Sequence, residues 1–313
     1  MNRIGLVDVD GHHYPNLVLM KLSAWHKKQG DTVEWADPGR AYDKVYKSKI
    51  FSWTKDNTPD YDCDTEYGGT GYGDYSKVLP DEIEHTCPDY SLYSIEDTAY
   101  GFTTRGCIRG CSFCIVPKKE GKIRPHAEIE EFLDGKKHLI LMDNNIVAHE
   151  HGIRQLEKCR EHKIAVDCNQ GMDARIISKS DYLIRLLAEL RVHNRYVRIA
   201  CDNASEIEPC RTVIDKVLEI NPKRRFIVYT LLTDDVEDSI HRGLLWQKYG
   251  HNVMVYAPPY RDFTNPEQQI PRWQKYFANW ANNKFEYYKA PFSEFIRTKM
   301  SDAEITEEYR GVV

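Results

Sequence analysis

From Thr98 to Asp262 the sequence alternates between short apolar runs and amphipathic stretches. Runs such as HLILMDNN (138–145) and YVRIACDNA (196–204) each end in polar residues, and a stretch with helical spacing, IEPCRTVIDKVLEIN (207–221), follows the second. Parallel strands are covered by helices on both faces and read as continuous apolar runs. The alternation therefore predicts an α/β fold with parallel strands, in which polar clusters lie at the carboxyl ends of the strands.

Six strands are expected in this region. They are predicted at 98–107, 138–145, 164–175, 196–204, 225–235 and 252–262, with helices at 126–137, 151–163, 181–194, 207–221 and 236–250. Strands and helices that alternate in this way are a parallel β/α barrel pattern, and the active sites of such barrels gather where the strands end.

Three cysteines lie close together in GCIRGCSFC, where Cys107, Cys111 and Cys114 have the spacing C-x3-C-x2-C. Soft thiolates select zinc, Cu(I) or an iron–sulfur cluster. Structural zinc sites close with four ligands, and no second CxxC pair is found in the sequence. Three thiolates on a cubane cluster leave one iron open to a non-protein ligand. The glycines let the loop bend around such a centre, and Phe113 would shield it.

With its phenylalanine before the last cysteine, the motif resembles the cluster loop of the radical S-adenosylmethionine (SAM) superfamily. The short predicted strand that runs into the loop, TAYGFTTRGC (98–107), stands where that family has its first barrel strand. The resemblance covers about Tyr100 to Asp262. It implies a partial (β/α)6 barrel, a [4Fe–4S] cluster on the three cysteines, SAM on the open iron, and a 5′-deoxyadenosyl radical that abstracts hydrogen from a substrate.

The resemblance also suggests roles for the polar residues at the strand ends. Asp143 and its two neighbours stand where many members carry a Gly-Gly-Glu-like stretch, so they are matched by position and chemistry alone. Arg175 is the natural partner of the SAM carboxylate, because a guanidinium binds a carboxylate through two hydrogen bonds. The residues expected at the cofactors are Phe113, Asp143, Asn144, Asn169, Arg175, Asp202 and Tyr256, and those expected at the substrate are Asn145, Gln170, Asp173 and Asn203.

The first residues predict a second, smaller α/β domain. Residues 3–35 read as strand, helix and strand, and a third strand follows within 42–53. This part resembles a truncated form of the Rossmann-like domain of cobalamin-binding radical SAM enzymes. Domains that ligate cobalt through histidine carry D-x-H-x-x-G. Here the stretch from Asp10 has His12 at the histidine position but ends in Pro15 in place of glycine. We therefore expect no cobalamin.

Four regions are predicted along the chain. Residues 56–97 are rich in Asp, Tyr, Gly and Pro and are expected to form an irregular linker or lid. The division is 1–55, a truncated Rossmann-like domain; 56–97, the linker or lid; 98–264, the partial barrel; and 265–313, a helical extension.

Charge is distributed unevenly. Residues 1–100 carry 10 Lys and Arg against 18 Asp and Glu, whereas residues 101–125 carry six basic side chains and one acid, Glu120. A nucleic acid polymer needs an extended basic face, which this balance does not favour. Strand ends rich in amides and carboxylates argue for a small polar substrate, since buried polar groups need partners. The resemblance adds an electron donor such as flavodoxin or ferredoxin.

The sequence has no run of 18 apolar residues and no charged-then-apolar leader, so neither a membrane span nor a signal peptide is expected. The expected compartment is the reducing cytoplasm, where thiols stay free. Nine cysteines, an odd number, also argue against a disulfide framework.

The favoured function is a radical SAM lyase or rearrangement enzyme that acts on a small polar compound, for example a modified nucleoside or a deazapurine such as queuosine. The lack of a second cluster motif argues against methylthiotransferases. One alternative is a cobalamin-dependent radical SAM methyltransferase. Another is a non-catalytic iron–sulfur or zinc protein.

Overall fold

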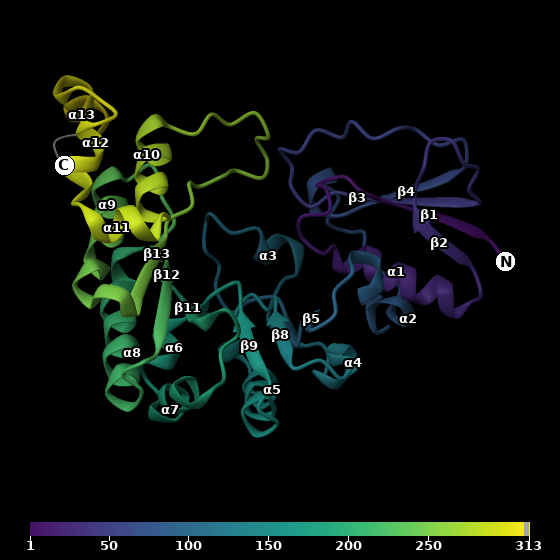
Figure 1. The fold of residues 1–313 in the computed structure, drawn as a ribbon, viewed down its shortest axis with the longest axis horizontal. Coiled ribbons are helices and arrows are strands. Elements are labelled where there is room, and N and C mark those ends of the chain that lie inside the picture. The colour runs from purple at the N-terminus through teal and green to yellow at the C-terminus, as the bar shows by residue number, and fades with distance from the viewer. Residues whose placement is uncertain (310–312) are drawn as a thin grey trace. The chain divides into compact units, whose positions relative to one another are not determined.

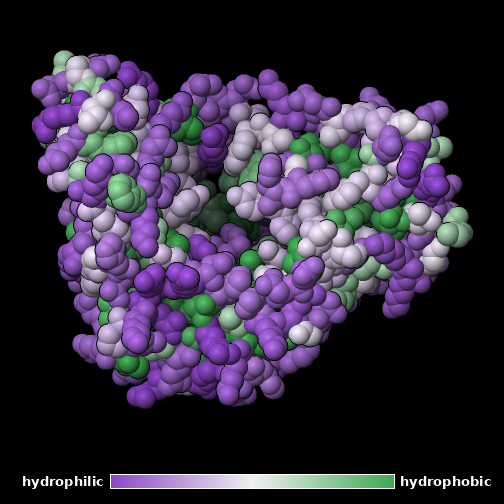
Figure 2. All heavy atoms as spheres, viewed as in Figure 1, coloured by the Kyte–Doolittle hydropathy of each residue, from purple (hydrophilic) through white to green (hydrophobic). Residues whose placement is uncertain are grey.

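The computed structural model describes residues 1–309 and 313, and the chain divides into two compact units. Unit 1 comprises residues 1–140 and 262–268, and unit 2 comprises 141–261 and 269–313. Figure 1 shows the elements of each unit, and Figure 2 shows hydrophilic residues over most of the visible face. Within the described ranges, no helix is both long and apolar enough to cross a bilayer.

Unit 1 begins with a four-stranded parallel sheet in the order β2-β1-β3-β4. Its register pairs Ile4 with Val33 on one side and with Lys44 on the other. The elements are β1 (Arg3–Asp8), α1 (Leu17–Lys28), β2 (Thr32–Trp35), β3 (Lys44–Ser48), β4 (Asp64–Gly68), α2 (Asp81–Glu84) and the 3₁₀ turns η1 (Thr70–Tyr72) and η2 (Tyr90–Tyr93).

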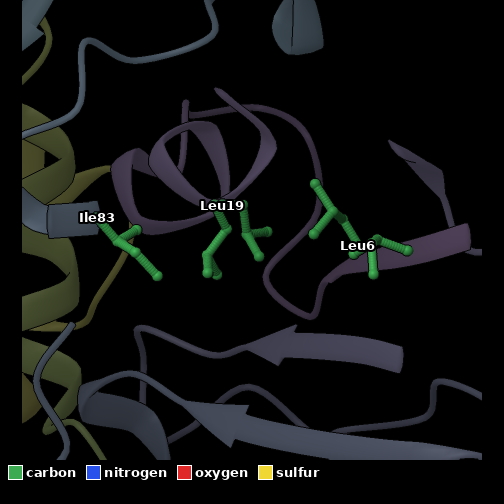
Figure 3. Close-up of a cluster of buried hydrophobic side chains, with 5 residues drawn as sticks. Leu6, Leu19 and Ile83 are labelled. Atoms are coloured by element: carbon green, nitrogen blue, oxygen red, sulfur yellow. The ribbon is translucent and has the colours of Figure 1, made fainter. Parts of the chain in front are cut away.

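Helix α1 forms where the sequence predicts it, and its apolar residues cover one face of the sheet. The side chain of Asn16 caps it by accepting a hydrogen bond from Leu19 N at 3.3 Å. Figure 3 shows Leu6 of β1, Leu19 of α1 and Ile83 of α2 in one buried cluster. The remaining members of this cluster are Ile4 and Leu22.

Strand β4 was missed by the sequence analysis, which treats 56–97 as irregular. Its sequence, DTEYG, has no apolar run, because β4 is an edge strand with largely exposed side chains. The strand is held by backbone pairing with β3, in which Val45 lies opposite Thr65, and not by burial of its own side chains.

The rest of unit 1 carries the cysteine loop. Strand β5 (Thr98–Gly101) is a hydrogen-bonded neighbour of β8, and β6 pairs antiparallel with β7. The boundary between the units falls inside β8. The further elements are β6 (Thr104–Arg105), α3 (Val116–Lys119), β7 (Arg124–Pro125), α4 (Glu130–Leu133) and β8 (His138–Leu141).

The helix predicted at 126–137 is much shorter than expected. His126 N and Ala127 N both donate to Thr103 O, at 2.9 and 3.4 Å, so the start of this segment continues the hairpin. The helix ends at Leu133 because Asp134 and Gly135 both take positive φ.

Unit 2 contains a second parallel sheet in the order β10-β11-β12-β13. Figure 1 shows α8 alongside β11 and β12. The strands are β9 (Ala165–Cys168), β10 (Met172–Asp173), β11 (Tyr196–Ala200), β12 (Arg225–Tyr229) and β13 (Val253–Tyr256). The helices are α5 (Glu150–Glu161), α6 (Ala174–Ile177), α7 (Asp181–Glu189), α8 (Ile207–Ile220), α9 (Val236–Leu244), α10 (Arg272–Ala281), α11 (Lys284–Lys289), α12 (Phe292–Arg297) and α13 (Asp302–Tyr309). Four 3₁₀ turns complete it: η3 (Ile146–Ala148), η4 (His193–Arg195), η5 (Ala204–Glu206) and η6 (Leu245–Asn252).

Hydrophobic spacing explains the long helices of this unit. Helix α8 buries Cys210, Val213, Ile214 and Val217, which are spaced three and four residues apart and so lie on one face. An apolar helix face of this kind packs against a sheet. Strand β11 has the matching pattern, because alternate residues along it are buried.

The strand predicted at 164–175 is two strands. Gly171 N donates to Cys168 O at 3.1 Å, and Gly171 has a φ of +85°. The resulting turn separates β9 from β10, and a residue with a side chain would be strained there. Only β10 then pairs with β11 in the four-stranded sheet.

The mixed α/β class with parallel sheets is confirmed. The predicted (β/α)6 barrel would draw its strands from both units, and it stays a proposal. The domain division made from the sequence also stays a prediction; its last region, 265–313, includes residues 310–312, which lie outside the described residues.

Candidate functional site

The three cysteines lie in unit 1 on the loop between β6 and α3, with β7 completing a hairpin after it. Thr104 pairs with Pro125 and Arg105 pairs with Arg124 at the base of this hairpin. None of the three takes part in a disulfide, and each is half-buried. All three belong to one short loop of the chain.

Backbone contacts close the loop at its base. Cys107 N donates to Gly121 O at 3.2 Å, and Gly106, with a φ of +80°, lies against the backbone of Gly121 and Lys122. A Cβ at Gly106 would stand 2.4 Å from Lys122 O, so only glycine fits at this position.

Glu120 reinforces this closure with its side chain. One carboxylate oxygen accepts a hydrogen bond from Gly106 N at 2.8 Å, and the other lies 3.3 Å from the Arg105 guanidinium. The Arg105 guanidinium also lies over the Phe102 ring, 4.0 Å from its centroid. The single acid of this segment is thus engaged at the loop's base.

The loop's donor set fits an iron–sulfur cluster in its chemistry. Three soft thiols occur within eight residues, and Arg109 N already donates to Cys107 Sγ at 3.4 Å, the kind of contact that tunes cluster potentials. Cys114 N donates to Cys111 O at 3.0 Å, which bends the chain between the last two cysteines. Half-buried Phe113 belongs to the same bend.

No three Cys, His, Asp or Glu side chains in the described part of the chain are gathered closely enough to hold a metal ion. The fit of the three cysteines to a cluster therefore rests on their chemistry and their shared loop.

The exposed side chains around the loop are mainly basic. Lys118, Lys119, Lys122 and Arg124 are all exposed on α3 and β7 or between them. Such a rim favours anionic groups near the loop.

The polar residues predicted at the strand ends lie in unit 2. Asp143 and Asn145 follow β8 and are buried, 2% and 3% exposed, and Asn144 between them is half-buried. Asn169 and Gln170 follow β9, and Asn169 N donates to Leu141 O at 3.1 Å. The Gln170 side chain is exposed and donates to Asn169 Oδ1 at 3.0 Å.

Asp173, Arg175 and Glu206 form one ionic cluster. Arg175 donates from Nε and Nη2 to the two oxygens of Asp173, at 2.8 and 3.1 Å. Its Nη1 lies 2.9 Å from Glu206 Oε1. Both carboxylates are buried and the arginine is half-buried. The residue that we expected to bind the SAM carboxylate is therefore held between two carboxylates of its own unit.

Glu206 also orders the residues that follow β11. It accepts hydrogen bonds from Asp202 N at 2.6 Å and from Asn203 Nδ2 at 2.8 Å. Burial, with Glu206 close by, raises the pKa of Asp202 to about 6, although Leu231 N donates to its carboxylate at 3.0 Å. Asp202 can therefore exchange a proton near neutral pH.

A second polar network crosses unit 2 and was missed by the sequence analysis. Arg198 of β11 makes two hydrogen bonds, at 2.6 and 2.8 Å, to the carboxylate of Asp167, which is 2% exposed. Arg198 also donates to Tyr229 Oη at 3.1 Å, and Tyr229 Oη donates to Asn169 O at 2.7 Å. The sequence signal for this network was a charged residue inside an apolar strand. Asp167 stands in VDC (166–168), and Arg198 stands in VRI (197–199).

Tyr256 is placed at the end of β13 as predicted, and its side chain is 47% exposed. Its ring lies 5.5 Å from that of Tyr229. The next residue is fixed by Asn282, whose Oδ1 accepts from Ala257 N at 2.6 Å and whose Nδ2 donates to Ala257 O at 3.4 Å.

The histidine considered for cobalt has an aromatic environment. The His12 ring stacks on Trp35 at 4.1 Å between ring centroids, with Tyr93 at 6.0 Å. The carboxylate of Asp10, the first residue of the cobalamin-like stretch, accepts from Ile50 N and Phe51 N. Through these contacts both His12 and Asp10 have structural roles in the loop that follows the carboxyl end of β1.

The predicted site residues thus fall into two groups: the cysteine loop with Phe113 in unit 1, and the strand-end residues in unit 2. Comparison with known proteins adds no family: no protein-family model matches this chain, and no curated protein matches it significantly.

Proposed function

We propose that the protein is a radical SAM enzyme. It binds a [4Fe–4S] cluster through Cys107, Cys111 and Cys114, cleaves SAM reductively and abstracts hydrogen from a small polar substrate. The observation that carries the proposal is the loop itself, with three cysteines at the motif's spacing on a hairpin whose base is closed by Glu120.

The bound cluster would supply the electron that splits the SAM sulfonium into methionine and a 5′-deoxyadenosyl radical. The loop's own residues hold the thiols in one segment, and Arg109 N donates to the first of them. The basic rim would assist the approach of an acidic electron donor such as flavodoxin or ferredoxin.

The strand-end residues of unit 2 would hold SAM and the substrate. Arg175, oriented by Asp173 and Glu206, is the proposed partner of the SAM carboxylate. Asp143 and Asn144 would accept from the SAM ammonium. Asp202 and Asn169 would bind the ribose hydroxyls, and Tyr256 would lie against the adenine.

A small polar substrate suits the amides and carboxylates that are not assigned to SAM. Asn145, Gln170, Asp173 and Asn203 are the residues proposed to contact it. A nucleoside-like compound, such as a deazapurine, would use these groups at the edges of its base. The reaction proposed after hydrogen abstraction is a lyase or rearrangement step.

The test is an anaerobic assay of SAM cleavage by protein reconstituted with iron and sulfide and reduced with dithionite. We expect formation of 5′-deoxyadenosine, which is lost in Cys111→Ser and retained in Cys63→Ser, a matched variant of a free, half-buried thiol outside the loop. Stimulation by nucleosides or deazapurines would support the substrate class.

Two outcomes would contradict the proposal. A protein that retains zinc but takes up no iron would support a structural metal loop. Stoichiometric retention of hydroxocobalamin after desalting, lost in His12→Ala, would favour the methyltransferase instead of the lyase.

A further inference from the structure

Unit 1 encloses a cavity of about 520 Å³ beside the cysteine loop. We call it the hairpin cavity, because one part of its wall is the β6–β7 hairpin and its loop, and another is the end of the sheet at β3 and β4. The volume lies in the range of about 300–1,000 Å³ that is typical of small-molecule sites. It also lies at the carboxyl ends of parallel strands, where α/β folds bind ligands.

Three cations of the lining stand without a carboxylate partner. Lys77 donates to Tyr67 O and Arg124 donates to Glu120 O, each at 2.8 Å. Lys119 is exposed on α3. In the described part of the chain, none of the three has a carboxylate at ion-pair distance. Their charge is available to a ligand.

The acids on the hairpin side of the lining are, by contrast, already engaged. Glu120 is bound to Gly106 N and Arg105. Glu84 lies 3.0 Å from both Lys21 Nζ and His126 Nε2. Although burial raises it, the hydrogen bond with His126 and the charge of Lys21 lower the pKa of Glu84 to about 2, so this carboxylate stays ionised and paired.

The acids on the sheet side are engaged or turned to solvent. Glu66 pairs with Lys44 at 2.9 Å, and Asp74 accepts from the backbone and hydroxyl of Ser76 at 3.0 and 2.6 Å. The Asp81 side chain is fully exposed. The cavity therefore offers Lys77, Lys119 and Arg124 to a bound anion, while its acids are engaged or exposed.

Aromatic rings supply the apolar part of the lining. Tyr46, Tyr67 and Tyr75 all border the cavity. Tyr75 lies on the same side as the cations, because Lys118 Nζ stands 5.1 Å from its ring centroid. Gly68 adds bare backbone, since a Cβ there would meet nothing within 4 Å. Tyrosine rings stack on heteroaromatic bases regardless of the base's identity.

We propose that the hairpin cavity binds a mononucleotide, with its phosphate at Lys119, Arg124 and Lys77 and its base against the tyrosine rings. A dianionic phosphate matches these three cations, and a planar base matches the aromatic lining. The site is separate from the cysteines, and the proposal does not rest on the proposed function. Its place at the base of the cysteine loop gives the ligand a direct mechanical connection to that loop through Glu120 and Arg124.

The test uses the full chain without iron or SAM, so its outcome is independent of cluster chemistry. Titration calorimetry with AMP, GMP, CMP and UMP should find at least one that binds with a Kd of about 100 μM or tighter. The corresponding nucleoside should bind about tenfold or more weakly, because it lacks the charge-assisted contacts.

Variants locate the site. Lys119→Met and Arg124→Met should each weaken nucleotide binding about fivefold or more, whereas Lys122→Met, an exposed lysine outside the lining, should change it by less than about twofold. Nucleoside binding should be unaffected by all three. The proposal is overturned if no mononucleotide binds below about 1 mM, if nucleosides bind as tightly as nucleotides, or if Lys122→Met equals Lys119→Met.

Discussion

The carboxylate of Glu120 accepts a hydrogen bond at 2.8 Å from the backbone N–H of Gly106, 14 residues earlier. Gly106 is buried and directly precedes the first cysteine of the motif, so this bond joins the two ends of the segment that carries all three thiols. The same side chain pairs with Arg105. A single acid in a basic stretch thus holds the cysteine loop closed.

Glu120→Ala should open this loop. It leaves a buried N–H without its acceptor, which costs about 1–3 kcal/mol. Urea unfolding should show that loss of stability, and trypsin should cleave more rapidly at Arg109 and Lys118. The matched control is Glu82→Ala, an exposed acid on α2, which should stay within about 0.5 kcal/mol of the parent protein. Equal stability and equal cleavage in the two variants would show that Glu120 does not close the loop.

Iron content should follow the cysteines of the loop. Anaerobically reconstituted protein should hold about four iron and four sulfide per chain, as a cluster on three thiolates implies. Replacement of Cys107, Cys111 or Cys114 by Ala should abolish the visible absorbance of the cluster, and Cys87→Ala, which replaces a half-buried thiol outside the loop, should not. Iron retained by all three loop variants would place the metal elsewhere.

Removal of Arg175 should destabilise unit 2, because the carboxylates of Asp173 and Glu206 would remain buried without their shared cation. We expect the free energy of unfolding to fall by about 2–3 kcal/mol at pH 7.5. This is near the lower end of the cost of breaking a buried ion pair, because the arginine is only half-buried. Arg154→Ala, which breaks an exposed pair with Glu150, should cost only about 0.3–0.5 kcal/mol.

The same variant also tests the proposed role of Arg175. SAM affinity should fall in Arg175→Ala and recover only partly in Arg175→Lys, which keeps the charge but loses the planar pair of donors. If SAM binds the Ala variant as tightly as the parent protein, Arg175 is a structural residue only.

The raised pKa of Asp202 should make the stability of the protein depend on pH. Its pKa of about 6 lies above the unfolded value of 3.8, so the folded state holds the proton more tightly. Stability therefore rises as the pH falls from about 6 toward 4, and the ionised carboxylate costs up to about 3 kcal/mol at neutral pH.

Asp202→Asn should remove this cost, because Asn cannot ionise and its Oδ1 can still accept from Leu231 N. Denaturation at pH 7.5 should show a gain in stability that disappears by about pH 4. Asp234→Asn, at an exposed position in the same unit, should give no such slope. A gain of the same size at both pH values would show that Asp202 does not titrate as described.

Strands that are apolar and helices that are amphipathic were predictable from sequence. Strands β11 and β12 alternate buried and half-buried residues and stand next to α8, whose buried residues recur at helical spacing. These patterns reflect burial, which depends on local sequence. The polar strand β4 has no such pattern, because its order comes from pairing with β3.

The candidate site was predictable only in part, for a similar reason. The cysteine loop is local, so its spacing can be read directly. The pairs Arg198–Asp167 and Arg175–Glu206 join residues 31 positions apart, and only the fold brings them together. Glu206 was missed because it lies beyond the strand end in a 3₁₀ turn, where a charged residue gives no sequence signal of burial.

The chain passes from one unit to the other three times, because residues 262–268 belong with unit 1 while their flanks belong with unit 2. Phe263 of this segment lies 6.1 Å from Trp53 between ring centroids, and that tryptophan stacks in turn on Phe51. Neither unit is therefore a continuous stretch of the gene. A fragment that stops at residue 140 would lack Phe263 and its ring contact with Trp53, so dissection of this protein requires a spliced or co-expressed segment, not a simple truncation.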